Sequence, residues 1–180
     1  MKKRLFFTGP IGCGKSTAIA SALGDRISQC GGFLTRRYRQ SHLHFTLESP
    51  DGRMKETFLD FSDGIPHLKS QIFEDLGPEW WQGKILLLDE IGGVELLCPG
   101  FMAALESALN SDIPIIGVVK GEAPASKLVM ALGLSEEYEK AANLLRTRLR
   151  EDGDTLVYTC SQFDENALLL AQNWVKEYCP

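Results

Sequence analysis

Residues 4–27 constrain the fold more than any other part of this 180-residue chain. They begin with a short apolar run, residues 5–8, which is typical of a buried strand. The next eight residues read GPIGCGKS and match the pattern G-x-x-x-x-G-K-S/T at every fixed position. An apolar stripe with helical spacing follows, formed by Ala18, Ile19, Ala20, Ala22, Leu23 and Ile27. This order of strand, glycine-rich turn and helix indicates a phosphate-binding loop, whereas an isolated match would fit a turn that binds nothing.

The residue types in this loop suit phosphate chemistry. Glycines let the backbone curl so that its N–H groups point inward toward phosphate oxygens, and the helix N-terminus adds further N–H groups and a positive dipole end. Lys15 is expected to reach the β- and γ-phosphates and to be catalytic, and the Ser16 hydroxyl is expected to ligate Mg²⁺. The nucleotide-binding residues predicted here are Gly9, Pro10, Ile11, Gly12, Cys13, Gly14, Lys15 and Ser16.

A second informative segment covers residues 84–90. Four consecutive apolar residues, 85–88, suit a parallel strand that is buried on both faces. Asp89 and Glu90 stand at its C-terminal end, where parallel sheets bind ligands, and they match a Walker B pattern. We expect Asp89 to hold Mg²⁺ through a water, and Glu90 to orient or deprotonate the attacking water. The alternative is a strand that merely ends in acidic residues.

Composition limits the partners and the compartment. The formal net charge is −5, so no global basic field would attract nucleic acid or an anionic membrane. The apolar run near the N-terminus is too short for a signal peptide, and no later run approaches membrane-spanning length. The five cysteines are widely spaced and form no C-x-x-C, which argues against a zinc site or a disulfide framework. We therefore expect a cytoplasmic protein.

The segment between the two motifs predicts antiparallel strands. Strand-like runs occupy residues 33–39, 42–47 and 55–60, with a Pro-Asp-Gly turn before the last of them. We interpret residues 32–60 as a hairpin insertion that elaborates the phosphate-loop fold and could form a flap near the nucleotide. His42 and His44 share one strand face, but no third ligand has a suitable spacing, so ordinary surface or packing histidines are favoured over a metal site.

Several arginines could stabilise a phosphoryl group during transfer. In a strand, Arg37 and Arg39 would face one way and Arg36 the other, so at most part of the trio can line a site. A second group lies on a predicted helix that could act as a lid. For each of them the alternative is a solvated surface position. The candidates are Arg36, Arg37, Arg39, Arg146, Arg148 and Arg150.

The rest of the chain alternates predicted helices and strands. Helices are expected at residues 66–79, 101–110, 124–132, 135–151 and 164–178, with Ser135 as an N-cap, and strands at residues 113–119 and 155–160. Helices between strands indicate parallel connections. The expected fold is a single α/β domain over residues 1–180, a three-layer P-loop sandwich with a mainly parallel sheet and the antiparallel insertion.

The combination of motifs resembles the small P-loop nucleoside-triphosphatase family that includes the cancer-related nucleoside-triphosphatase. The resemblance rests on residues 9–17, on Gly32-Phe33-Leu34-Thr35 with Arg39, on Asp89-Glu90-Ile91-Gly92 with Glu95, and on total length. It implies Mg²⁺-dependent hydrolysis of several nucleoside triphosphates, slowly, to the diphosphate and phosphate. By position it adds Thr17, Asp89, Glu90 and Glu95 to the nucleotide-binding residues. The chain departs from the family at Gly93, where lysine is common.

The sequence leaves two other functions open. A nucleoside or nucleotide kinase would use a similar scaffold with an acceptor pocket, and Glu90 could equally accept a proton from a substrate hydroxyl. A nucleotide-dependent switch or assembly factor would bind nucleotide with little turnover, although no N-K-x-D motif is present. In each case the expected ligand is a nucleoside triphosphate, ATP, GTP or another, and no protein partner is indicated.

Overall fold

The computed structural model describes residues 1–122, 130, 132–134, 136–162 and 164–179. Within these residues, eight strands form one sheet in the order β5-β4-β3-β2-β6-β7-β1-β8. Five neighbouring strands run parallel, in agreement with the predicted fold class. They are β1 (Arg4–Thr8), β2 (Gly31–Arg39), β6 (Leu86–Ile91), β7 (Ile115–Val119) and β8 (Thr155–Thr159).

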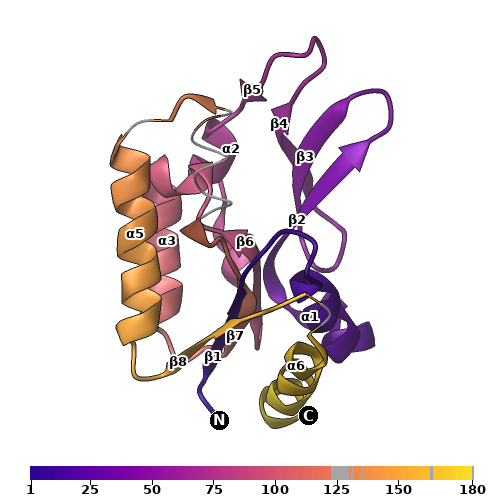
Figure 1. The fold of residues 1–180 in the computed structure, drawn as a ribbon, viewed down its shortest axis with the longest axis vertical. Helices are drawn as coiled ribbons and strands as arrows, with labels where there is room; N and C mark the ends of the chain where they lie inside the picture. The colour runs from indigo at the N-terminus through magenta and orange to yellow at the C-terminus, as the bar shows by residue number, and fades with distance from the viewer. Residues whose placement is uncertain (123–129, 131, 135, 163, 180) are drawn as a thin grey trace.

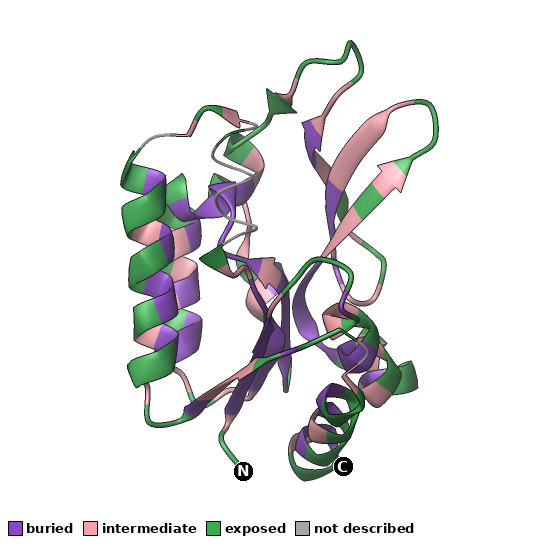
Figure 2. Ribbon diagram, viewed as in Figure 1, coloured by how far each residue is buried: buried purple, intermediate pink, exposed green. Residues whose placement is uncertain are grey.

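Helices cover both faces of the parallel strands (Figure 1). On one face lie α1 (Lys15–Leu23), which continues as the 3₁₀-helix η1 (Gly24–Gln29), and α6 (Glu165–Tyr178). On the other face lie α3 (Pro99–Asn110) and α5 (Glu136–Glu151). The central strands between these layers are buried, as Figure 2 shows. In β6, Leu86 and Leu88 pack in the α3–α5 core and Leu87 in the α1–α6 core, which is the pattern of a strand covered on both sides.

Three antiparallel strands extend the sheet beyond β2. They are β3 (Leu43–Glu48), β4 (Lys55–Asp60) and β5 (His67–Leu68). The first residues of β2, Gly31 to Phe33, pair with β6 in parallel, and the rest of β2 pairs with β3. The strand that the sequence analysis assigned to an insertion outside the core therefore also belongs to the parallel sheet. Because one strand serves both parts, the antiparallel strands are joined to β6 through β2.

The prediction of one long helix over residues 66–79 is wrong. This segment contains β5, the single turn α2 (Gln71–Glu74) and the 3₁₀-helix η2 (Pro78–Trp81). Leu68 pairs with Leu59 in the sheet, and Gly77-Pro78 stops any continuing helix because proline removes a backbone donor. The helix is predicted from the spacing of Leu68, Ile72, Phe73 and Leu76, of which only Phe73 is buried. The spacing of these apolar residues is compatible with separate turns that pack on the core as well as with one helix.

The other predicted elements that lie on described residues begin and end within a few residues of the predicted positions. The helix predicted at residues 124–132 and the cap at Ser135 fall on residues outside those described, apart from 130 and 132. Among the described residues, no helix combines the length and apolarity needed to cross a bilayer. All five cysteines are free thiols, four of them buried.

Phe101 should be one of the side chains on which the α3–α5 core depends. It is fully buried and its ring lies 5.9 Å from Phe33, 6.0 Å from Phe73 and 5.7 Å from Trp81, centroid to centroid. We expect Phe101→Ala to lower the free energy of unfolding by about 3–5 kcal/mol, measured by urea denaturation. The control Leu144→Ala, at a position that is 69% exposed, should change it by less than about 0.5 kcal/mol. Equal losses in the two variants would contradict this description of the core.

Candidate active site

The loop between β1 and α1 depends on glycine conformations. Gly9, Gly12 and Gly14 have φ values of 126°, 80° and 93°, in a region that other L-residues rarely adopt. A Cβ atom at Gly9 would also lie 2.5 Å from the carbonyl oxygen of Cys160. These glycines produce the tight turn that the sequence predicted between strand and helix, and they leave its backbone free of obstructing side chains.

The predicted magnesium ligands contact each other. The Ser16 hydroxyl at the start of α1 donates to Asp89 Oδ1 at 2.7 Å. Asp89 lies in β6 and is only 2% exposed, and the Thr35 hydroxyl of β2 donates to its backbone carbonyl at 3.0 Å. Two residues that are 73 positions apart in the chain are thereby joined at the C-terminal edge of the sheet. The fold brings together the residues that the two motifs nominated separately.

The environment of Asp89 disfavours its charge. Burial raises the pKa of this carboxyl from 3.8 to about 6, and the nearby Glu90 charge adds to the increase. The Ser16 hydrogen bond and the charges of Lys120 and Arg36 act in the opposite direction. A divalent cation beside Asp89 would favour its ionised form.

The donor set at Ser16 and Asp89 fits Mg²⁺. A hydroxyl and a carboxylate are hard oxygen ligands, and Mg²⁺ is commonly held by one or two such groups together with water and substrate phosphates. Among the described residues, no group of three or more His, Cys, Asp or Glu side chains converges as a metal site. His42 and His44 instead pack on each other, with ring centroids 5.2 Å apart, and His44 stacks on Tyr38.

Lys15 lies within the curl of the loop. Its ammonium donates to the carbonyl oxygens of Gly9 at 3.2 Å and Pro10 at 2.6 Å, and it lies 3.4 Å from the sulfur of Cys13. Cys13 is buried, whereas Pro10, Ile11, Gly12, Gly14 and Thr17 are exposed. The ammonium of Lys15 is thus held by carbonyl oxygens of its own loop.

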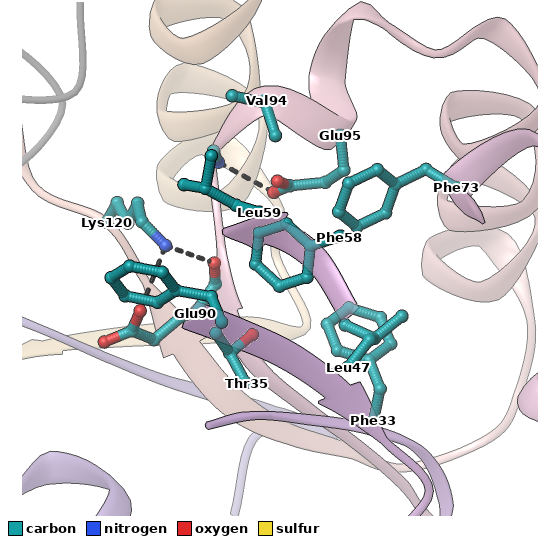
Figure 3. A pocket seen from close by; sticks show the side chains of 12 residues that line it. Phe33, Thr35, Leu47, Phe58, Leu59, Phe73, Glu90, Val94, Glu95 and Lys120 are labelled. Atoms are coloured by element: carbon teal, nitrogen blue, oxygen red, sulfur yellow. Dashed lines mark hydrogen bonds and ion pairs between the residues drawn. The ribbon is translucent and has the colours of Figure 1, made fainter. Parts of the chain in front are cut away.

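Glu90 has an unusual backbone and an unforeseen partner. Its φ of 64° is the only positive value at a non-glycine residue among those described. The Lys120 ammonium donates to the Glu90 carbonyl at 2.9 Å and lies 3.2 Å from its carboxylate Oε2 (Figure 3). Lys120 is not among the site residues predicted from the sequence. It directly follows the apolar strand β7, so the rule that selected Asp89 after β6 would have selected it too.

A cavity of about 450 Å³ opens between the loop and the antiparallel strands. Gly9, Ile11 and Lys15 of the loop line it on one side, and β2 to β4 contribute mostly apolar side chains on the other. Its polar lining residues are Lys15, Thr35, Arg37, Glu90 and Lys120. The antiparallel strands therefore face the predicted phosphate site across a space that contains the predicted base.

Glu95 has a different position from the other predicted nucleotide ligands. It lies in the 3₁₀-helix η3 (Val94–Leu97), is 6% exposed, and accepts from the backbone N–H groups of Gly92 and Gly93, both at 2.7 Å. It lines a separate cavity of about 80 Å³, with Glu90 and Lys120 but no loop residue (Figure 3). This carboxylate therefore stabilises the turn after β6 by accepting hydrogen bonds from its backbone.

The candidate arginines are dispersed. Arg37 lines the larger cavity and its guanidinium lies 5.9 Å from the Phe45 ring centroid, whereas Arg36 acts electrostatically on Asp89. Arg146 is buried and donates to Asn143 of its own helix, and Arg148 donates to Asn110 of α3. These two helix arginines bind within the α3–α5 layer. The remaining candidates, Arg39 and Arg150, are exposed.

Strand, glycine loop and helix, with a buried acidic strand end beside them, define a P-loop α/β protein of the nucleotide-hydrolysing class. Residues 62–151, half of the chain, match the sequence profile of the NTPase family, and the chain belongs to that family. This membership confirms the resemblance found in the sequence and identifies the chain as an enzyme of the nucleoside-triphosphatase family. The matched residues include Asp89 and Glu90 but not the loop.

Individual relatives extend the similarity over a larger part of the chain. The chain is 28% identical to nucleoside-triphosphatase THEP1 of Thermotoga petrophila over 129 residues, which are 65% of this chain and 72% of the relative. It is 21% identical to the protein of the same name from Thermotoga maritima over 178 residues, covering 92% and 91%. The crystal structure of THEP1 from Aquifex aeolicus superposes with a TM-score of 0.66 and 16% identity, covering 98% of this chain and 99% of that one, so it shares the fold.

The raised pKa of Asp89 predicts a pH-dependent stability difference in metal-free buffer. The folded protein keeps this proton up to about pH 6 whereas an unfolded chain releases it near 3.8, so ionisation destabilises the native state as the pH rises through that interval. We expect Asp89→Asn to be more stable than the wild type at pH 7.5, by at most about 3 kcal/mol, and the gap to close below pH 4. Urea denaturation with chelator present measures both.

The exposed Asp154→Asn variant is the control, and its stability relative to the wild type should not follow this pH pattern. A wild type that is more stable than Asp89→Asn at pH 7.5 would show that the Asp89 anion is favoured in the folded protein without a metal.

Proposed function

We propose that this protein is a Mg²⁺-dependent hydrolase that converts nucleoside triphosphate and water to nucleoside diphosphate and phosphate. The observation that carries the proposal is the 2.7 Å hydrogen bond between Ser16 and Asp89 at the mouth of the glycine loop, with Glu90 next in sequence. The name nucleoside-triphosphatase, borne by the Thermotoga relatives, supports the substrate class.

Each group has a defined chemical task in this proposal. The loop N–H groups and Lys15 bind the phosphate oxygens, and Ser16 and Asp89 would hold Mg²⁺, which when bound neutralises phosphate charge. Glu90 accepts the proton of the attacking water, whose oxygen bonds to the terminal phosphorus as the bond to the diphosphate oxygen breaks. Phosphate contacts of this kind recognise no base, so we propose that several nucleoside triphosphates are used.

We also propose that turnover is slow. An arginine that stabilises the transferring phosphoryl group raises kcat by about 10³-fold or more. Arg37 is exposed and lies against Phe45, and Arg36 lies on the Asp89 side of β2, so neither is fixed at the loop by a contact of its guanidinium there.

Replacing the proposed base tests the mechanism. We expect Glu90→Gln to lower phosphate release from Mg-ATP and Mg-GTP by about 10²–10⁴-fold, because the amide cannot accept the proton, while nucleotide binding persists. Colorimetric phosphate release measures the first effect and titration with a fluorescent nucleotide the second. Glu137→Gln, at an exposed position on α5, is the matched control and should hydrolyse like the wild type. Full activity of Glu90→Gln, or full wild-type activity in EDTA, would contradict the proposal.

The larger cavity favours a second candidate function, phosphoryl transfer to a small hydroxyl-bearing acceptor. At about 450 Å³ it exceeds by far the roughly 30 Å³ that one water occupies, and its lining is mostly apolar. Glu90 would then take the proton of the acceptor hydroxyl. With γ-³²P-labelled ATP and a panel of nucleosides and nucleoside monophosphates, transfer would place the label on the acceptor. Hydrolysis alone leaves the label in inorganic phosphate whichever acceptor is added. That result would exclude the members of the panel as phosphoryl acceptors.

A further inference from the structure

Lys120 holds the segment that carries the proposed base at three points. Its backbone N–H donates to the Ile91 carbonyl at 2.8 Å. Its ammonium donates to the Glu90 carbonyl at 2.9 Å and to the Glu90 carboxylate at 3.2 Å. Lys120, which follows β7, therefore contacts the main chain of the last two residues of β6 and the side chain of Glu90.

Glu90 needs such a contact because its backbone is strained. With φ at 64° it lies in the left-handed region, where a side chain with a Cβ is disfavoured, and the pairing of β6 with β7 shifts register between Leu88 and Ile91. Strained conformations persist only when the surroundings over-determine them. The turn that follows is held separately, by Glu95 on the Gly92 and Gly93 N–H groups and by the Tyr138 hydroxyl on the Gly92 carbonyl, at 2.8 Å.

The ammonium is confined rather than solvated. The Lys120 side chain is 20% exposed and that of Glu90 is 41% exposed. A Cβ atom at Gly93 would lie 3.6 Å from the Lys120 nitrogen, so the missing side chain leaves room for it. Both residues line the larger cavity, which Lys15 also lines. They line the adjoining smaller cavity as well, and Figure 3 shows the pair there. A partly buried ammonium with two acceptors on one residue orients that residue more firmly than an exposed ion pair does.

We propose that Lys120 is a positioning residue that fixes the Glu90 carboxylate toward the nucleophile. The inference rests on the proposed function, since Glu90 is the base of that reaction. A base must lie within hydrogen-bond reach of the proton it removes, and a misplacement of about 1 Å can cost about 10²-fold in rate. Lys120 supplies this placement through its contacts with Glu90, and it binds no part of the nucleotide.

Steady-state hydrolysis of Mg-ATP by Lys120→Met and Lys120→Arg tests the inference. Methionine matches the lysine side chain as far as Cε and removes the ammonium donors, so we expect kcat to fall about 10²-fold with KM changed less than about threefold. Arginine retains donors for both acceptors and should recover at least tenfold of that loss. The control Lys140→Met removes an ammonium 3.9 Å from Glu136 in a pair whose side chains are 78% and 91% exposed, and it should leave kcat unchanged.

A double-mutant cycle separates positioning from direct contact with phosphate. In the Glu90→Gln background, Lys120→Met should cause no further loss, because the residue through which it acts is already disabled. A further tenfold loss there, or an unchanged kcat of Lys120→Met in the wild-type background, would overturn the inference. A crystal structure of Lys120→Met gives a readout that does not require turnover. An unmoved Glu90 carboxylate in it would overturn the positioning role, whereas an inactive wild type would instead overturn the proposed function.

Discussion

The arrangement of the site depends on the hydrogen bond between Ser16 and Asp89. Because Asp89 is 2% exposed, this bond forms in a poorly solvated environment, where it is stronger and its loss more costly than at the surface. It joins the first turn of α1 to the end of β6, although β7 separates β6 from β1, the strand that precedes α1. The loop that precedes α1 is thereby fixed against the strand that carries the acidic residues. The same contact places two hard oxygen donors side by side and, together with the charges of Lys120 and Arg36, limits the rise in the pKa of Asp89 to about 6.

The parts of the site that sequence predicts are those set by local chemistry. Few other structures are compatible with three glycines at positive φ and a lysine before a helical stripe. A buried parallel strand that ends in Asp89 places this residue at the same edge of the sheet. Contacts between distant segments are not encoded in this way. Spacing alone does not show that β2 pairs with both β6 and β3, that Glu95 turns back onto Gly92 and Gly93, or that residues 66–79 break at Gly77-Pro78.

The turn after β6 is held by groups from three parts of the chain, of which two are remote in sequence. Glu95 accepts from its N–H groups, Tyr138 of α5 donates to the Gly92 carbonyl, and Lys120 after β7 donates to Glu90. Burial and the nearby Glu95 charge raise the pKa of Tyr138 to about 12, so its hydroxyl remains a donor at any physiological pH. Each group satisfies a main-chain donor or acceptor that a strained turn would otherwise leave without a partner. The unusual backbone of Glu90 is therefore supported by Lys120 directly and by Glu95 and Tyr138 through the turn that follows it.

The two acids at the end of β6 are separated by the alternation of a strand. Asp89 follows the direction of Leu87 toward the α1 side, where it meets Ser16, and Glu90 lies on the side of Leu88, where it meets Lys120 and the cavity. In the proposed reaction these consecutive residues would therefore have different roles, Asp89 toward the cation and Glu90 toward the nucleophile. A shift of one residue in the pairing of β6 would exchange these directions, which would put the buried carboxylate in the cavity and remove the partner of Ser16. The parallel register of Leu86 to Leu88 with β2 and β7 fixes this assignment, so the chemistry of the site depends on the alignment of three buried strands.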